Sequence, residues 1–388
     1  MVTIKEALRI IEDQKITLQR ETKPLEASLG YALAANTAAP FDVPEFDNSA
    51  MDGYALCGLY QEYKLVGEVA AGDSKEILMK DGEAVRIFTG AKVPQNTTAV
   101  MMQEKTTVKA STLFLDEMPK TEQNIRKKGG QLKEGQEVFE KGHILNPPSL
   151  ALMGSLGLAQ LEVFSKPQVN IITTGNELVK PGKSKTEGQI YESNSYAISG
   201  ALQQFGFKHH KKTQIQDDFE ATKAGIKTAL DSCDVLIISG GISVGDYDFV
   251  KQSLEENGVN ELFYKVFQKP GKPLYFGRKQ DQFVFALPGN PASSLTCFYV
   301  YVLPLLQKLS GYQEYGLPTY QFPIKHPYEN RFGRPSFLKA AVFDGKAQIL
   351  DGQGSSMIQS MAKGSALAFV DEGEKLAEGD LIRCKLIS

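Results

Sequence analysis

The stretch that decides the fold reads DVLIISGGISVGDYDF at residues 234–249, FYKVFQKPGKPLYFG at residues 263–277 and FVFALPGNP at residues 283–291. Each apolar run stops at a turn that is rich in Gly or Pro and carries charged or polar groups. Runs of this length and composition are typical of strands covered on both faces. In open α/β sheets the ligand binds where such strands end. Because the first turn is acidic and the second carries lysines, the stretch predicts a cleft for an anionic ligand held with a metal ion.

The pattern of strands and helices outside this stretch predicts several domains. Strand–helix alternation over residues 166–310 indicates a doubly wound, mostly parallel sheet with right-handed crossovers. Short alternating segments over residues 63–108, and again after residue 311, predict two all-β parts, each a small barrel or sandwich. The segment FDVPEFDNSAMDGYAL at residues 41–56 is dense in Asp, Asn, Pro and Gly, which favours a loop.

Helical signals occur near the N-terminus and again about 140 residues later. Thr3 and Glu6 form a capping-box pattern before an apolar helical face. A second short helix is expected over residues 28–36. Pro147 opens another helical run, in a position that suits proline. If this run packs beside the N-terminal helices, the first domain is discontinuous.

The composition limits the classes of protein to which the chain can belong. A length of 388 residues predicts roughly two to four domains, and a formal net charge of -3 argues against a general nucleic-acid or membrane-surface binder. The four cysteines include no C-x-x-C pair, which argues against a disulfide framework or a zinc site. No signal-peptide pattern and no membrane-length apolar run is found. We therefore expect a soluble, cytoplasmic protein that binds neither nucleic acid nor membrane.

The segment from Ser239 to Asp248 is the most distinctive Gly-rich turn. Clustered glycines let backbone amides approach a phosphate or a pterin-like ring closely. The segment matches neither the P-loop pattern of ATPases nor the dinucleotide-binding fingerprint. Asp246 and Asp248 are separated by one residue, and two such carboxylates could bind Mg²⁺. A structural turn in which one of these aspartates caps the next helix is the alternative interpretation.

Two further turns carry groups that suit an anion. Lys265, Lys269 and Lys272 lie in or beside a loop stiffened by prolines, and a rigid loop with point positive charges suits an oxyanion. Surface lysines without a role are the alternative. The LPGNP segment at residues 287–291 presents backbone amides and a helix N-terminus, which form a ready anion site. Asn290 is placed to cap that helix.

Other polar residues near predicted strand ends have a structural interpretation as well as a functional one. Glu177 lies in a turn directly after a strand. One of Asp217 and Asp218 is expected to cap the following helix, which leaves the other for a further role. Asn194 is expected to cap a helix of its own. Thr89 alone would be a turn residue that satisfies its own backbone.

Seven motifs occur together along the chain: MDGYA (51–55), RIFTGA (86–91), TTGNEL (173–178), GQIYESN (188–194), SGGISVGDYD (239–248), KPGKP (269–273) and ALPGNP (286–291). With these motifs the chain resembles the molybdopterin molybdenumtransferases over essentially its whole length, and the C-terminal domain of gephyrin is similar. The resemblance implies insertion of molybdate into molybdopterin adenylate, with Mg²⁺-dependent release of AMP, in molybdenum cofactor biosynthesis. It also implies a homodimer with an inter-subunit active site, and an upstream molybdopterin adenylyltransferase as a partner.

The resemblance further implies a division of the chain into four domains. They are a discontinuous helical linker domain at residues 1–40 and 125–165, a small β domain at 41–124, a molybdopterin-binding α/β domain at 166–310 and a C-terminal β-barrel domain at 311–388.

Site residues are carried over from the family motif by motif. The matches imply a catalytic set of Asp52, Thr89, Glu177, Asp248, Lys265 and Lys269. A substrate-binding set comprises Gly240, Gly241, Ser243, Gly245, Lys272, Pro288, Gly289, Asn290, Pro291, Arg334 and Ser355, with Ser356 as an alternative to Ser355. Metal ligands are expected among Glu177, Asp217 or Asp218, Asp246 and Asp248. Asn176 and Asp246 stand where the family frequently has aspartate and glutamate.

Two other function classes compete with this assignment. One is a scaffold that keeps the fold and has lost catalysis, which is disfavoured because Asp52, Glu177 and Asp248 are all present. The other is a different nucleotide-pyrophosphate hydrolase that reuses the α/β domain. Such a protein should lack both the MDGYA motif and the C-terminal β segments, and this chain has both.

Overall fold

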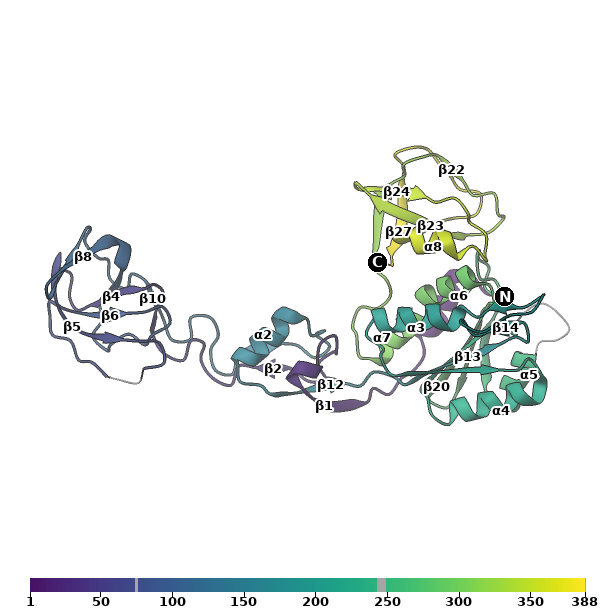
Figure 1. Ribbon diagram of the computed structural model, residues 1–388, viewed down its shortest axis with the longest axis horizontal. Coiled ribbons are helices and arrows are strands. Elements are labelled where there is room, and N and C mark those ends of the chain that lie inside the picture. Colours follow the sequence, from purple (N-terminus) through teal and green to yellow (C-terminus); the bar gives the residue numbers. More distant parts are fainter. Residues whose placement is uncertain (74–75, 243–248, 388) are drawn as a thin grey trace. The chain divides into compact units, whose positions relative to one another are not determined.

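The computed structural model describes residues 1–73, 76–242 and 249–387. The chain forms two compact units (Figure 1). Unit 1 comprises Met1–Ala34, Gly142–Leu150 and Gln160–Ser388, and unit 2 comprises Ala35–Lys141 and Ala151–Ala159. Unit 1 contains a mostly parallel α/β sheet and a separate β sheet, and unit 2 is built mainly from β-strands. The predicted fold class, a multidomain α/β and β protein, is confirmed.

A six-stranded sheet forms the centre of unit 1. Its strands are β13 (Val169–Thr174), β16 (His210–Ile215), β17 (Val235–Ser239), β18 (Asn260–Tyr264), β19 (Tyr275–Lys279) and β20 (Gln282–Leu287). They are arranged in the order β16-β13-β17-β20-β19-β18. The first four pair in parallel, whereas β19 runs antiparallel to both of its neighbours. The carboxyl ends of β13, β16, β17 and β20 therefore meet at one edge of the sheet.

Helices cover both faces of this sheet (Figure 1). They are α3 (Asn194–Gln204), α4 (Phe219–Leu230), α5 (Phe249–Glu256), α6 (Pro291–Cys297), the π-helical turn η3 (Phe298–Val302) and α7 (Leu303–Leu309). Successive strand residues alternate between two cores: Ile171 packs with α3, α6, η3 and α7, and Ile172 packs with α4 and α5. This two-sided burial explains why the strand sequences are apolar throughout rather than alternating.

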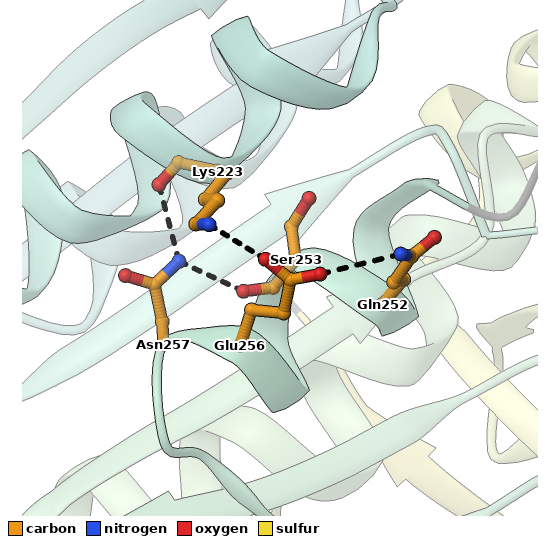
Figure 2. A network of polar contacts seen from close by, with 5 residues as sticks. All are labelled: Lys223, Gln252, Ser253, Glu256 and Asn257. Carbon is orange, nitrogen blue, oxygen red and sulfur yellow. Dashed lines mark hydrogen bonds and ion pairs between the residues drawn. The ribbon is translucent and has the colours of Figure 1, made fainter.

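A polar network fastens α4 to α5, the helix that follows the Gly-rich segment (Figure 2). The Lys223 ammonium donates to a Glu256 carboxylate oxygen at 2.6 Å, and Gln252 donates to the other oxygen at 3.3 Å. The Asn257 amide donates to the carbonyl of Lys223 at 3.1 Å and to that of Ser253 at 2.8 Å. Asn257 therefore bridges the end of one helix and the middle of the other.

We expect Asn257→Ala to destabilise the protein by about 1–2 kcal/mol, because the carbonyls of Lys223 and Ser253 each lose a hydrogen bond from the Asn257 side chain. Urea unfolding followed by circular dichroism measures the change. Glu256→Gln is the matched control, and its effect should be smaller because the ion pair that it weakens is exposed to solvent. If Asn257→Ala is at least as stable as Glu256→Gln, the stabilising role of the Asn257 hydrogen bonds is contradicted.

The N-terminal residues join the α/β core. Helix α1 (Ile4–Glu12) starts at the predicted capping box: the Glu6 amide donates to Thr3 Oγ1 at 3.2 Å, and the Thr3 amide donates to Glu6 Oε2 at 2.8 Å. Ala7 and Ile11 of α1 are buried in the core that holds α3. Strand β1 (Arg20–Pro24) then pairs antiparallel with β12 (Gln160–Phe164).

The prediction of a short helix over residues 28–36 is wrong. A single 3₁₀ turn, η1 (Leu25–Ala27), precedes this segment. Ala32 forms an isolated bridge with Ile144, and Leu33 forms one with Val163. Backbone pairing with distant residues outweighs the weak local helix propensity here. The helical run that begins at Pro147 is confirmed as α2 (Pro147–Ser155).

The C-terminal part of unit 1 is a five-stranded antiparallel sheet in the order β21-β27-β25-β23-β24, with a β22–β26 pair beside it. Its elements are β21 (Thr319–Pro323), β22 (Tyr328–Glu329), β23 (Ser336–Phe343), β24 (Lys346–Ile349), α8 (Ile358–Lys363), β25 (Ala366–Val370), β26 (Lys375–Leu376) and β27 (Leu381–Leu386). A bridge between Ile324 and Ala347 joins the two edges of this sheet, as a barrel requires.

Unit 2 is built around a six-stranded sheet in the order β7-β4-β6-β5-β9-β8. Its strands are β4 (Gly53–Leu56), β5 (Glu62–Val69), β6 (Glu83–Ile87), β7 (Ala99–Met102), β8 (Thr106–Lys109) and β9 (Thr112–Leu115). Two smaller pairs also belong to the unit: β2 (Thr37–Ala38) with β11 (Glu137–Phe139), and β3 (Asn48–Ser49) with β10 (Ile125–Arg126). The segment at residues 41–56, predicted as a loop, thus ends in an interior strand. Gly53 is required there because a Cβ would lie 1.9 Å from the Met101 carbonyl oxygen.

Candidate functional site

A cavity of about 620 Å³ lies at the carboxyl edge of the α/β sheet. Four strand ends contribute to its walls: Thr173–Gly175 at the end of β13, Asp217 after β16, Ser239–Ile242 at the end of β17 and Pro288–Pro291 after β20. Further lining residues come from neighbouring segments, namely Glu177, Leu178, Ile190, Tyr191, Glu192, Ser193, Asn194, Pro273 and Ser356. The cavity is therefore at the place where open α/β sheets bind their ligands.

The turn after β17 brings backbone close to the cavity. Gly240 and Gly241 have φ values of +97° and +64°, which side-chain-bearing residues rarely adopt. A Cβ at Gly240 would lie 2.5 Å from the Thr174 carbonyl oxygen, and one at Gly241 would lie 2.6 Å from a methyl group of Val250. Both glycines are thus needed for close packing against β13 and α5. The other site residues predicted in this turn lie outside the described residues, namely Ser243, Gly245, Asp246 and Asp248.

Two predicted carboxylates, Glu177 and Asp217, line the cavity. Glu177 folds back over Gly175: a Cβ at that glycine would lie 2.8 and 2.9 Å from the two carboxylate oxygens. Asp217 accepts a hydrogen bond from the Thr174 hydroxyl at 3.1 Å. Asp218 instead caps α4 by accepting from the Ala221 amide at 2.9 Å. Of the two aspartates that the sequence left open, Asp217 is the one that faces the cavity.

The donors present are compatible with a magnesium ion. Over residues 1–73, 76–242 and 249–387, no group of three or more His, Cys, Asp or Glu side chains is arranged to hold a metal. Mg²⁺ commonly binds through only one or two protein carboxylates, together with water and substrate phosphates. Glu177 and Asp217 meet that requirement with oxygen donors of the right kind.

Asn194 has a different role from the predicted one. The cap position of α3 is Ser193, and the first-turn amide of Ser195 is bound by the Glu192 carboxylate at 2.7 Å. The Asn194 amide donates instead to Ser239 Oγ at 2.8 Å and to the Gly289 carbonyl at 2.7 Å. It therefore ties the Gly-rich turn to the turn after β20. Its partners lie so far away in the chain that no local pattern could have indicated them.

The start of α6 differs from the predicted anion site. The Ala292 and Ser293 amides both donate to the Ser355 carbonyl, at 3.1 and 3.3 Å. Asn290 occupies the cap position, but its side chain donates to Ser355 Oγ at 3.0 Å rather than capping the helix. The expectation that this helix end offers its first-turn amides to an anion is wrong for those two amides, because a C-terminal loop binds them.

Side-chain hydrogen bonds hold the predicted lysine loop. Buried Gln268 accepts from the Tyr301 hydroxyl and donates to the Gly271 carbonyl at 3.1 Å. The Lys269 ammonium lies 3.1 Å from the ring centroid of Phe332. Burial, with a smaller effect from Arg334, lowers the pKa of Lys269. Pro273 is the residue of this loop that lines the cavity, whereas the side chains of Lys265, Lys269 and Lys272 lie outside its lining.

Asp52 and Thr89 of unit 2 are brought together by strand pairing. Gly53 of β4 pairs with Ile87 of β6, so the residues just beyond them become neighbours. Asp52 Oδ1 accepts from the Thr89 amide and from the Thr89 hydroxyl, both at 2.7 Å. The hydrogen bond from the Thr89 amide, then that from its hydroxyl and the charge of Arg86, lower the pKa of Asp52. The exposed carboxylate therefore stays ionised at pH values where a free aspartate is partly protonated.

Comparison with known proteins agrees with this arrangement. Three family models match in order: the MoeA N-terminal region (domains I and II) at residues 2–157, a probable molybdopterin binding domain at 170–308 and the MoeA C-terminal region (domain IV) at 323–387. A molybdopterin molybdenumtransferase of Haemophilus influenzae is 38% identical over 327 residues, covering 82% of this chain and 80% of the relative. The chain belongs to the molybdopterin molybdenumtransferase (MoeA) family.

Other relatives support the same family. A molybdopterin molybdenumtransferase of Staphylococcus aureus is 31% identical over 319 residues, covering 80% of this chain and 76% of the relative. The crystal structure of a MoeA molybdopterin biosynthesis protein from Pyrococcus horikoshii superposes with a TM-score of 0.83 at 30% identity, over 100% of this chain and 99% of that one. The resemblance drawn from the seven motifs is thus confirmed. In the described part of the chain, no helix is long and apolar enough to span a bilayer.

Proposed function

We propose that this chain is a molybdopterin molybdenumtransferase of the cytoplasm, which inserts molybdate into molybdopterin adenylate and releases AMP in a Mg²⁺-dependent reaction. The observation that carries the proposal is the cavity at the carboxyl edge of the sheet, where two carboxylates face a glycine turn in a chain of the MoeA family. Molybdopterin adenylate is the product of an adenylyltransferase, so an enzyme of that class is the expected upstream partner.

The residues of the cavity have separate tasks in this proposal. The backbone at Gly240 and Gly241 approaches the substrate closely, and Asn194 fixes that turn relative to Gly289. Glu177 and Asp217 would hold a magnesium ion, which neutralises the charge of the pyrophosphate when it is bound. The nearby lysine loop adds positive charge that favours two anionic substrates in one cleft.

We further propose that Asp52 and Thr89 act on the substrate bound by a second copy of the chain in a homodimer. Asp52 is exposed, ionised and held in one orientation by two hydrogen bonds from Thr89. Such a preorganised carboxylate on a surface suits contact with a group outside its own unit. The two copies would then share two equivalent composite sites, as a two-fold axis requires.

The direct test of the function is a stoichiometric assay. Purified protein is mixed with molybdopterin adenylate, molybdate and Mg²⁺, and AMP is measured by chromatography. We expect one AMP for each molybdenum inserted, and omission of Mg²⁺ should abolish release. Absence of AMP release by the wild-type protein would overturn the enzymatic proposal in favour of a non-catalytic scaffold.

Shared composite sites predict complementation between inactive variants. When Asp52→Asn and Glu177→Gln chains are co-expressed in equal amounts, half of the dimers are mixed and each contains one intact site. We therefore expect about a quarter of the wild-type activity from two variants that are nearly inactive alone. A mixture of Glu177→Gln with Asp217→Asn is the control and should stay inactive, because both changes lie in the same half-site. Equal activity of the two mixtures would rule out sharing between copies.

A further inference from the structure

Lys339 in β23 is a buried lysine with 3% of its surface exposed. Lysine is rarely buried unless its charge is satisfied. Its ammonium donates to the backbone carbonyls of Gly352, Gly354 and Met357 at 2.6, 2.8 and 3.1 Å. An ammonium has three donors, so these carbonyls use its full capacity. Residues 352–357, called the serine loop below, are therefore folded around this one side chain.

The backbone of Lys339 holds the same loop a second time. The Lys339 amide donates to Gln353 Oε1 at 3.0 Å, and Gln353 Nε2 donates back to the Lys339 carbonyl at 2.9 Å. Gln353 Nε2 also donates to the Leu350 carbonyl at 2.7 Å. The serine loop is thus fixed to one residue of β23 from both its side chain and its main chain.

The serine loop reaches the candidate site on its other side. The Ser355 carbonyl accepts from the Ala292 and Ser293 amides of α6, its hydroxyl oxygen accepts from the Asn290 amide at 3.0 Å, and Ser356 lines the cavity. A displacement of the loop would therefore change both the cavity wall and the hydrogen bonds at the start of α6.

The start of β23 and the residue before it hold the lysine loop as well. The Lys269 amide donates to the Pro335 carbonyl at 2.9 Å, and the Phe337 amide donates to the Lys269 carbonyl at 2.8 Å. A strand rises about 3.3 Å per residue, and Phe337 and Lys339 are two residues apart in β23. One strand therefore sets the separation between the lysine loop and the serine loop.

We propose that Lys339 is a positioning residue, which holds Ser355 and Ser356 at a fixed place relative to Lys269 so that the cavity can accept an oxyanion. The identity of that oxyanion as molybdate rests on the proposed function. The C-terminal sheet then serves the reaction by spacing two loops that each contribute a residue, Pro273 and Ser356, to the lining of the cavity. Burial lowers the pKa of Lys339, and the carbonyl oxygens around the ammonium compensate for the cost of burying it.

The test compares Lys339→Met, which keeps much of the side-chain volume without the donors, with Lys339→Arg, which restores donors. For Lys339→Met we expect the KM for molybdate to rise about tenfold, the effect of losing charge-assisted hydrogen bonds, with a much smaller change in kcat. Lys339→Arg should recover most of this loss. Lys346→Met, an exposed lysine on the neighbouring strand β24, is the matched control and should leave the KM unchanged.

Amide hydrogen exchange tests the role of Lys339 independently of the enzymatic activity. In Lys339→Met the Ala292 and Ser293 amides should exchange at least about tenfold faster than in the wild type, because their acceptor is no longer held in place. Unchanged exchange would overturn the role of Lys339 whether or not the enzyme is active. If the wild type releases no AMP, the proposed function fails and exchange still decides the role of Lys339. Should Lys339→Met not fold, Gln353→Ala should show the same change to a smaller degree, and no change there would also overturn the proposal.

Discussion

The Glu177→Gln variant is expected to lose AMP release by at least about 100-fold, the scale of removing a group that acts at the reacting centre. Glutamine keeps the shape of the side chain, so the packing over Gly175 survives. The change removes the charge of one of the three acidic side chains among the described residues that line the cavity, Glu177, Glu192 and Asp217. The affinity for Mg²⁺ should fall together with the rate of AMP release. The unfolding temperature should stay near that of the wild type.

Two measurements and one control decide this prediction. Turnover is followed as AMP release over a range of Mg²⁺ concentrations, and Mg²⁺ affinity is measured by calorimetric titration in the presence of molybdopterin adenylate. Glu187→Gln, an exposed glutamate in the loop before β15 (Ile190–Tyr191), should behave as the wild type. A Glu177→Gln variant with more than half of the wild-type turnover would remove Glu177 from the site.

Local sequence patterns were sufficient for those parts of the site that a strand end creates. Apolar runs followed by Gly-rich or Pro-rich turns placed Gly240, Gly241 and Pro288 correctly at the carboxyl edge. The same reasoning placed Glu177 there, since its turn follows β13 directly. In each case the position depends on the end of a parallel strand, which the hydrophobic pattern indicates.

Long-range hydrogen bonds could not be read from the sequence. Asn194 stands where an asparagine often caps a helix, yet its amide binds Ser239 and Gly289. Lys339 looks like an ordinary lysine of a β-strand, but its ammonium is enclosed by carbonyls of the serine loop. Only the folded arrangement brings such partners together, because propensity describes a residue with its neighbours in the chain and not with its neighbours in space.

Helix capping shows how local sequence patterns differ from the long-range contacts of the folded chain. The capping box of Thr3 and Glu6 involves residues three apart and was predicted correctly. At α6 the side chain of the expected cap, Asn290, instead donates to the Ser355 hydroxyl oxygen of the C-terminal part. The Ser355 carbonyl also accepts hydrogen bonds from the first-turn amides of α6. A local cap is therefore replaced by a tertiary one, and the start of α6 becomes the joint between the α/β sheet and the serine loop.

The Gly240→Ala variant is expected to lose both activity and stability. A methyl group at this position would lie 2.5 Å from the Thr174 carbonyl oxygen, and the backbone φ of +97° is strained for alanine. We expect a destabilisation of about 2–4 kcal/mol from strain and steric overlap. AMP release should fall by at least about 100-fold even in the folded fraction, because the turn that approaches the substrate must move away from β13.

Gly200→Ala is the matched control, since Gly200 lies within α3, close in sequence to the cavity residue Asn194, and a Cβ there would meet no atom within 4 Å. This substitution should stabilise the protein by about 0.5–1 kcal/mol, the difference in helix propensity between alanine and glycine, and leave turnover unchanged. Urea unfolding and the AMP assay are applied to both variants. If Gly240→Ala is as stable and as active as Gly200→Ala, the turn after β17 tolerates a side chain, and close backbone approach to the substrate cannot be its role. If activity falls without any loss of stability, the methyl group is accommodated by β13 and acts on the substrate directly, which places Gly240 in contact with it.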